Sequence, residues 1–401
     1  MPSPNEEQPS ADEWDGPESL LQLLQGLPDP RKDHNKCHRL VDILAIAILG
    51  ALCSVDNYVE LERFARIKEK WLRTFLQLPA GIPSHDTIGR VFAALEPQAF
   101  LELFVRWVQS WREPLGLEHV AIDGKAIRAA LARSQRSSPL MILSAFAVES
   151  GLVLGQVQTE DKSNEIEAVP RLLETLRLKG KLVTLDALHC QSETVKKLHG
   201  CGAHYCIAVK DNQAGLRKAI DDHMRPKCSQ LRAAPQTDRM LETVEKGHGR
   251  IETRRYFISD ELDALELREM KDSLRWPGVN VIGCVERERT VLATGKSSYE
   301  RTMYIASLPR PDVELFAKAV RGHWAIETSL HWVLDMAFDE DRCTVRTKHA
   351  SQNYAMIRKF ALNLLRQDRT NKVGIQCKRK MCGWDHAYLF GILTGKFSHD
   401  S

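Results

Sequence analysis

The sequence predicts an α/β protein in which a mixed sheet carries helices on both faces. Three observations support this fold class. Residues from about 20 to 108 have the apolar spacing of helices, strand and helix patterns alternate from residue 119 to 210, and strand patterns without helices follow until helices resume near residue 313. We therefore expect a helical N-terminal part, an α/β part, and a β-rich insertion within the α/β part.

Length and composition favour two domains with flanking tails. The chain has 401 residues, of which 43% are hydrophobic, and this supports a sizeable core. Residues 1–18 are rich in Pro, Ser and acids, and we expect them to form a disordered acidic tail. The first 20 residues hold six acids and no Lys or Arg, so the formal charge of +3 becomes +9 for the rest of the chain. A basic body suits a polyanionic partner, although many other proteins carry a similar charge.

The cysteine pattern and the apolar runs indicate a cytoplasmic protein without a membrane segment. Ten cysteines are scattered through the chain and no secretory leader precedes them, so we expect reduced thiols. The most apolar run, residues 43–53, falls short of the roughly 20 residues of a membrane helix and is expected to be a buried helix. The C-x4-C pairs Cys201/Cys206 and Cys377/Cys382 are more typical of incidental thiols than of zinc sites, which use tighter, matched pairs.

Residues 19–112 are expected to form an all-helical N-terminal domain. A Gly/Pro loop at residues 79–83 separates two helical patterns, and Ser84 is positioned to cap the second. Helix, short turn and helix is also the outline of a DNA-reading module, with His85 and Arg90 near the start of its second helix. Ordinary helical packing gives the same outline, so both interpretations stay open.

Residues 113–368 have the element order of an α/β domain. Strands and helices are expected in this order: strands at 119–123, 139–149 and 152–160, a helix from Asn164 to about Leu178, a strand at 181–186, a helix near 192–198, and a strand at 204–210. A three-stranded meander that leads into alternating helices and strands is the order of ribonuclease-H-like folds. The sequence therefore predicts a ribonuclease-H-like mixed sheet with flanking helices.

The alternation of strands and helices stops between about residues 214 and 312, where we expect the β-rich insertion. Short strand patterns occur at 253–259, 279–290 and 302–308. Amphipathic helices resume after the insertion and continue to about residue 367. Residues 369–401 are expected to be a basic C-terminal extension.

Three carboxylates are placed where an α/β sheet can bind a ligand. Asp123 and Asp186 each end an apolar strand pattern, and ligands bind at that end of strands in open α/β sheets. An Asp there is also a common helix cap or turn residue, so the pair alone leaves both interpretations open. Glu327, in the segment HWAIETSLHW, lies at the rim of an apolar helical stripe, which suggests a polar site at the edge of the core.

Three carboxylates with no obligatory soft ligand favour Mg²⁺ or Mn²⁺. Two such ions roughly 3.5 to 4 Å apart can activate a water or a 3′-hydroxyl and stabilise the leaving oxygen of a phosphodiester. His323, Glu327 and His331 share a helix face, which raises a zinc alternative, but ligands spread over about 12 Å are too far apart to hold one ion. We expect the two histidines to pack or to contact a DNA backbone, and the acidic run 339–341 to be solvated or to cap a helix.

Nine short motifs extend from near residue 20 to residue 367. They are DPR (29–31), PSHDTIGRVF (83–92), IDGKAIR (122–128), KSNEIEAVPRLL (162–173), TLDALHCQ (184–191), VKDNQ (209–213), GHGRIETR (247–254), HWAIETSLHWVLDMAFDED (323–341) and NYAMIRKFALNLLR (353–366). As a set, these motifs resemble bacterial insertion-sequence transposases of the DDE class, most closely the H-repeat-associated type.

The resemblance implies an enzyme that cleaves DNA at the ends of an insertion sequence and joins them to target DNA. It makes Asp123, Asp186 and Glu327 the catalytic and metal-binding acids, with two Mg²⁺ or Mn²⁺ ions per active site. It also implies terminal-repeat and target DNA as partners, a homodimer in the DNA complex, and association with a bacterial nucleoid. Two alternatives remain: a metal-dependent nuclease of the same fold that does not join strands, and an inactive DNA-binding remnant.

Broader relatives of this class have a Tyr, an Arg and a Lys around the glutamate that grip phosphates. The corresponding places hold Val320, His323 and Leu334, so these roles do not carry over, and Arg321 or His331 are the candidate substitutes. The residues expected to contact DNA are Lys210, Arg250, Arg254, Arg255, Arg321, His323 and His331.

Overall fold

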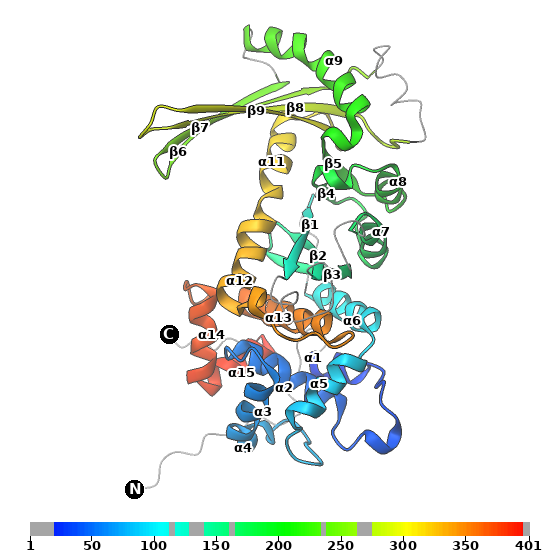
Figure 1. The fold of residues 1–401 in the computed structure, drawn as a ribbon, viewed down its shortest axis with the longest axis vertical. Helices are drawn as coiled ribbons and strands as arrows, with labels where there is room; N and C mark the ends of the chain where they lie inside the picture. Colours follow the sequence, from blue (N-terminus) through cyan, green and yellow to red (C-terminus); the bar gives the residue numbers. More distant parts are fainter. Residues whose placement is uncertain are drawn as a thin grey trace.

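A nine-stranded mixed sheet runs through the described part of the protein, in the strand order β3-β2-β1-β4-β5-β9-β8-β7-β6 (Figure 1). The computed structural model describes residues 20–111, 117–127, 140–159, 165–233, 238–262 and 275–395. The acidic tail expected at residues 1–18 and the helix start expected at Asn164 lie outside these ranges. The predicted α/β class, with a mixed sheet and many helices, is confirmed.

The first five strands follow the predicted order. β1 (His119–Ile127) pairs antiparallel with β2 (Leu140–Ala147), which pairs antiparallel with β3 (Leu152–Thr159). On its other side β1 runs parallel to β4 (Leu182–Leu185), and β4 runs parallel to β5 (His204–Val209). The helices α7 (Glu165–Thr175) and α8 (Ser192–Gly200) connect the parallel strands, as parallel pairing requires.

The β-rich insertion continues the same sheet. Its strands are β6 (Met240–Gly247), β7 (Arg250–Ser259), β8 (Val281–Val291) and β9 (Ser297–Ser307), all antiparallel, and β9 pairs antiparallel with β5. Before them comes the 20-residue helix α9 (Ala214–Ala233), which packs on β7, β8 and β9 and which the sequence reading did not predict. β9 is longer than the predicted 302–308 because only its second half is apolar and buried, whereas β8 nearly coincides with the predicted 279–290.

The N-terminal part is helical, as predicted. Its helices are α1 (Leu20–Gln25), α2 (Leu40–Leu52), α3 (Tyr58–Ile67), α4 (Glu69–Leu72), α5 (His85–Ala94) and α6 (Pro97–Ser110). All 13 residues of α2 are buried, which confirms the buried helix expected from the apolar run. Ser84 caps α5, since its hydroxyl accepts a hydrogen bond of 3.3 Å from the Thr87 amide. Among the described helices none is long and apolar enough to cross a membrane.

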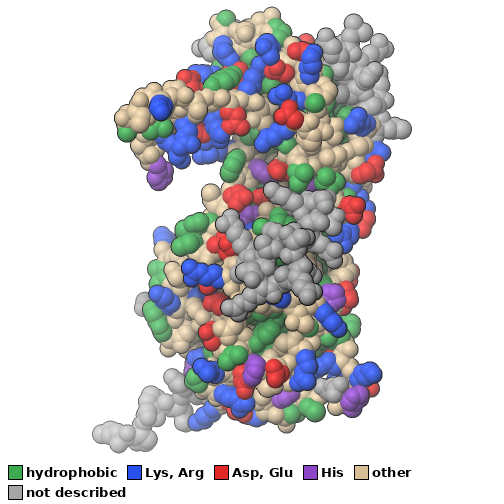
Figure 2. All heavy atoms as spheres, viewed as in Figure 1, with side chains coloured by type: hydrophobic (Ala, Val, Ile, Leu, Met, Phe, Trp, Pro, Cys, Tyr) green, Lys and Arg blue, Asp and Glu red, His purple; other side chains and the backbone are tan. Residues whose placement is uncertain are grey.

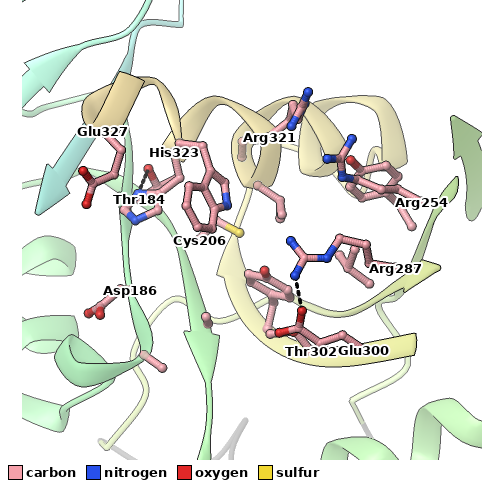
Figure 3. Close-up of a pocket in the computed structure, with 18 of the residues that line it drawn as sticks. Thr184, Asp186, Cys206, Arg254, Arg287, Glu300, Thr302, Arg321, His323 and Glu327 are labelled. Atoms are coloured by element: carbon pink, nitrogen blue, oxygen red, sulfur yellow. Dashed lines mark hydrogen bonds and ion pairs between the residues drawn. The ribbon is translucent and has the colours of Figure 1, made fainter. Parts of the chain in front are cut away.

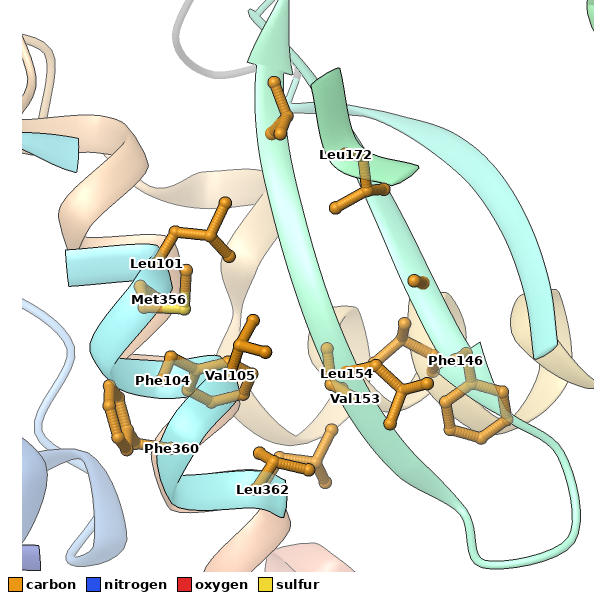
Figure 4. Close-up of a cluster of buried hydrophobic side chains, with 14 of the residues drawn as sticks. Leu101, Phe104, Val105, Phe146, Val153, Leu154, Leu172, Met356, Phe360 and Leu362 are labelled. Carbon is orange, nitrogen blue, oxygen red and sulfur yellow. The ribbon is translucent and has the colours of Figure 1, made fainter. Parts of the chain in front are cut away.

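The N-terminal helices share a hydrophobic core with the sheet and with α13 (Ala350–Gln367). Figure 4 shows side chains of α6 and α13 beside those of β3: Leu101, Phe104 and Val105, then Met356, Phe360 and Leu362, then Val153 and Leu154. Almost all of α13 is buried, as in a helix surrounded by core. Its Asn363 bonds both to the amide and to the carbonyl of Val153, each at 2.9 Å, which fixes α13 against the sheet.

Two helices in the expected basic C-terminal extension also pack on the body. These are α14 (Ile375–Trp384) and α15 (His386–Thr394). The guanidinium of Arg379 in α14 is buried, donates to the Ala51 carbonyl at 2.7 Å, and lies 3.1 Å from the Asp56 carboxylate. The extension is therefore attached to the N-terminal helices by a buried cation.

A helical column connects the insertion to the core (Figure 1). It consists of α11 (Val313–His323), the π-helical turn η5 (Ile326–His331) and α12 (Trp332–Phe338). Asp312 caps α11 by accepting hydrogen bonds from the amides of Glu314 and Leu315. α11 packs on β1 and β4, and η5 packs on β1, so the column carries Glu327 to the edge where the first parallel strands end.

Candidate active site

The three predicted carboxylates come from three elements that meet at one edge of the sheet. Ile122 of β1 is paired with Leu185, the last residue of β4, so Asp123 and Asp186 follow the same strand pair. Asp123 was expected to end its strand, but β1 continues beyond it because Asp123 pairs with Ser144 of β2. Glu327 joins them from η5, and all three line a cleft of about 550 Å³.

Asp123, Glu327 and His331 form a compact group in which the ligand atoms lie within 4.8 Å of one another. His331 Nδ1 is 3.2 Å from a Glu327 oxygen and 3.9 Å from an Asp123 oxygen. Burial, and then the negative charge of Glu327, raise the pKa of Asp123 to about 8. The hydrogen bond with His331 holds the pKa of Glu327 below its usual value. The charge of Glu327 and burial therefore disfavour ionisation of Asp123, and a divalent cation between the two acids would remove this penalty.

Asp186 is the more open acid of the three, with about half of its side chain exposed. Its carboxylate accepts a hydrogen bond of 3.0 Å from the Leu188 amide, and His189 Nε2 lies 3.8 Å away. This Asp therefore acts as a cap of the short helical turn that follows β4, and it also faces the cleft. The cap interpretation is confirmed for this residue, and its role as a metal ligand stays a prediction.

His323 points away from the pair formed by Glu327 and His331. Its Nδ1 is 3.1 Å from the Thr184 hydroxyl (Figure 3). That hydroxyl is in turn 2.7 Å from His119 Nε2. Burial lowers the pKa of His323 to about 4, so the ring is neutral near pH 7. The three-residue zinc grouping on one helix face is therefore not formed among the described residues, because His323 is bonded to β4 and lies outside the compact group.

Basic side chains from the insertion line the opposite wall of the cleft. Residues at every second position of a strand share a face, and Arg250 and Arg254 of β7 lie on the cleft face with Arg287 and Arg289 of β8. Figure 3 shows Asp186 and Glu327 on one side and Arg254 and Arg287 on the other. Figure 2 shows Lys and Arg side chains gathered on the underside of the arm formed by β6–β9, above a hollow.

Of the ten residues singled out from the sequence, eight line this cleft: Asp123, Asp186, Lys210, Arg250, Arg254, Arg321, His323 and Glu327. Arg255 lies on the other face of β7, where it pairs with Glu242 and Glu288. His331 is only 4% exposed and lies behind the carboxylates, so the expected DNA contact does not fit its position.

Sequence reasoning missed several cleft residues. Arg287 and Arg289 occur at alternate positions in VERERT, a signal that would have placed them on one face of the predicted strand. Acids moderate the charge of this wall, since Glu245 is 3.0 Å from Arg254 and 2.8 Å from Arg321.

Within the acidic run 339–341, Asp339 is exposed as expected, but Glu340 differs from the expectation. Glu340 is 1% exposed rather than solvated, and its carboxylate lies 3.4 Å from Lys125 Nζ. Lys125 Nζ is also 2.7 Å from Asp335 of α12. Lys125 is two residues from Asp123 on β1, so these ion pairs attach the Asp123 strand to the helical column that carries Glu327.

The α/β sheet carries three carboxylates at one edge, opposite a basic wall, and comparison with known proteins identifies the class of protein. Residues 114–364 match the family described as "Transposase DDE domain", and residues 21–108 match the family described as "DDE_Tnp_1-associated". The chain belongs to the DDE transposase family.

Similar proteins over most of the chain include two that are named as putative transposases. The chain is 33% identical over 377 residues to the "H repeat-associated putative transposase YhhI" of Escherichia coli K12, covering 94% of this chain and 98% of that protein. It is 35% identical over 379 residues to the "Putative transposase YncI" of Escherichia coli O157:H7, with 94% and 95% covered. A piggyBac transposase synaptic complex with hairpin DNA gives a TM-score of 0.44 at 10% identity over 95% of this chain and 82% of that chain, a likeness too low to carry an argument.

Proposed function

We propose that this transposase cleaves DNA at the ends of an insertion sequence and joins those ends to target DNA, in a divalent-metal-dependent reaction. The observation that carries the proposal is the meeting of Asp123, Asp186 and Glu327 at the edge of the sheet, in a cleft whose other wall is basic. The strand order β3-β2-β1-β4-β5, with the first three antiparallel and the next two parallel, supports a ribonuclease-H-like catalytic part over residues 113–368.

The donor set fits Mg²⁺ or Mn²⁺, two ions per site. Three carboxylates supply the oxygen ligands that such ions prefer. The pKa of Asp123 is raised because burial and the charge of Glu327 disfavour its ionised form, and no cation among the described residues compensates for them. Bound at these acids, the ions would supply Lewis-acid stabilisation of the attacking and leaving oxygens of a phosphodiester. Asp186 and Glu327, each about half exposed, present their carboxylates to the cleft where a DNA backbone can approach.

The basic wall is suited to the DNA backbone. Arg250 and Arg289 line the cleft, and within the described part of the chain neither has an ion-pair partner, so both are available for phosphates. Arg254, Arg287 and Arg321 are paired with acids and would exchange those partners for phosphate. Lys210 extends this wall from the end of β5.

We assign the N-terminal helices to recognition of the terminal repeats and a homodimer to holding the two element ends. Residues 19–112 would recognise the terminal repeats, with α3 and α5 as the helix pair; His85 of α5 is anchored to Glu62 of α3 at 2.7 Å. A homodimer would hold two element ends together in the DNA complex, acting at the bacterial nucleoid in the cytoplasm.

A strand-transfer assay tests the proposal. Full-length protein, Mn²⁺ or Mg²⁺, labelled terminal-repeat DNA and a supercoiled target plasmid should give label covalently joined to the plasmid. Cleavage without joining would favour a nuclease of the same fold. Sequence-specific binding with neither reaction would favour an inactive DNA-binding remnant.

A further inference from the structure

The buried imidazole of His331 is a donor that a three-carboxylate centre does not use. It belongs to the last residue of η5, one helical turn after Glu327, and only 4% of it is exposed. Its Nδ1 points at both acids, 3.2 Å from Glu327 and 3.9 Å from Asp123. A nitrogen in this position is out of reach of DNA and directed into the carboxylate group.

These separations suit ligands of one ion. In an octahedral site with bonds of about 2.1 Å, neighbouring ligand atoms lie about 3 Å apart and opposite ones about 4 Å apart. The distances from Nδ1 to the two carboxylate oxygens fall in this range before any adjustment of side chains. The three groups therefore need only small movements to surround one cation.

Glu327 and His331 lie four residues apart within one π-helical turn. A π-turn is wider than an α-turn and is frequently found at functional sites. Here it ends with His331 turned into the interior while Glu327 stays half exposed at the cleft. His323, four residues before Glu327 and preceding the π-turn, is directed instead to Thr184.

Within the described ranges, the second ring nitrogen of His331 lacks the hydrogen bond to a carboxylate or carbonyl that metal-bound histidines usually have. Nε2 of His331 is buried and without a hydrogen-bond partner among the described residues, and so is Oε1 of Glu340. Burial pushes the pKa of Glu340 upward, but Lys359, Lys125, Arg358 and His331 together outweigh it and keep the group ionised. The Glu340 carboxylate therefore interacts with His331 through charge, without a hydrogen bond to Nε2.

We propose that His331 is a fourth protein ligand of the metal centre, on the ion shared by Asp123 and Glu327, and that it makes the centre select Mn²⁺ over Mg²⁺. Mg²⁺ takes oxygen ligands almost exclusively, whereas Mn²⁺ accepts an imidazole nitrogen beside carboxylates. The inference rests on the proposed metal-dependent function, and it adds a residue and a preference that the acidic triad alone does not supply.

Metal binding by the full-length protein tests this inference without an activity readout. Mn²⁺ binding would be measured by electron paramagnetic resonance, and Mg²⁺ binding by its competition with Mn²⁺, for wild type and for His331→Gln, His331→Asn, His323→Gln and Asp123→Asn. Wild type should prefer Mn²⁺ by about tenfold or more, and both His331 variants should lower Mn²⁺ affinity about tenfold while changing Mg²⁺ affinity less than about threefold. His323→Gln, a buried histidine outside the carboxylate group, should keep the wild-type preference. Thermal unfolding of each variant checks that it is folded.

A purely electrostatic role of His331 would change the metal affinity in the opposite direction. If His331 were only a positive counter-charge for the two acids, its replacement would raise the affinity for both ions, because a competing cation has been removed; that outcome, or an unchanged Mn²⁺ preference, would overturn the proposal. If the proposed metal-dependent function were wrong, the metal-binding measurements would give a third pattern. In that case wild type would bind neither ion, or Asp123→Asn would bind both as wild type does.

Discussion

Asp123→Asn should stabilise the metal-free protein, and the gain should grow with pH. Burial and the charge of Glu327 raise the pKa of Asp123 to about 8 in the folded state, against 3.8 for the unconstrained carboxyl. Between these values the folded protein holds a proton that the unfolded chain has lost, so the stability this proton provides falls by about 1.4 kcal/mol per pH unit as pH rises toward the folded pKa. From pH 5 to pH 8 the loss is at most about 4 kcal/mol, and we expect about half, since Glu327 shares the titration.

The neutral amide of Asn cannot ionise, so this loss should be absent from the variant. Urea unfolding in EDTA, followed by tryptophan fluorescence, should show that the difference in unfolding free energy between Asp123→Asn and wild type increases by about 2 kcal/mol between pH 5 and pH 8. Asp186→Asn is the matched control, because Asp186 is half exposed and its bond from the Leu188 amide can be kept by an amide oxygen. A difference that is the same at both pH values, or an Asp123→Asn protein less stable than wild type at pH 8, would refute the account of the carboxylate group.

Two further predictions concern charges around the site. Lys125→Met should lower the unfolding free energy by about 2 kcal/mol in urea unfolding, because it removes the cation 3.4 Å from Glu340, 1% exposed, while Lys359 and Arg358 remain; a cost under about 1 kcal/mol would show that the pair contributes little. Arg250→Gln combined with Arg289→Gln should weaken binding to terminal-repeat DNA and reduce the salt slope by about 2, measured by fluorescence anisotropy. Arg255→Gln, on the other face of β7, should leave the slope unchanged; equal effects of the two sets would contradict the assignment of the cleft face.

The fold was predictable where apolar periodicity reports contact with the core. The apolar run of α2 and the strands β1 to β5 were recognised because their buried residues form continuous or alternating patterns. α9 was missed because only Ile220, Met224 and Cys228 are buried among its 20 residues, and β6 was missed because none of its residues is buried. Elements that touch the core weakly leave little signal in the sequence.

The site was predictable to the extent that it depends on strand ends. Asp123 and Asp186 follow a shared pair of parallel strands, and that relation can be read from two apolar patterns that each end in Asp. The approach of His331 to Asp123 depends on a π-turn and on packing over more than 200 residues of sequence, and helical spacing does not encode either. The burial of Glu340 depends in the same way on Lys125, a partner far away in the chain.

The most direct measurement of the central claim is metal-dependent nicking of terminal-repeat DNA by wild type and by Asp123→Asn, Asp186→Asn and Glu327→Gln. An amide cannot supply the negative charge that each carboxylate gives to the site, so we expect each variant to lose nicking by a factor of about 1,000 or more while binding the same DNA with affinity close to that of wild type. Nicking at the wild-type rate by any one of the three variants would show that its carboxylate is not part of the catalytic centre.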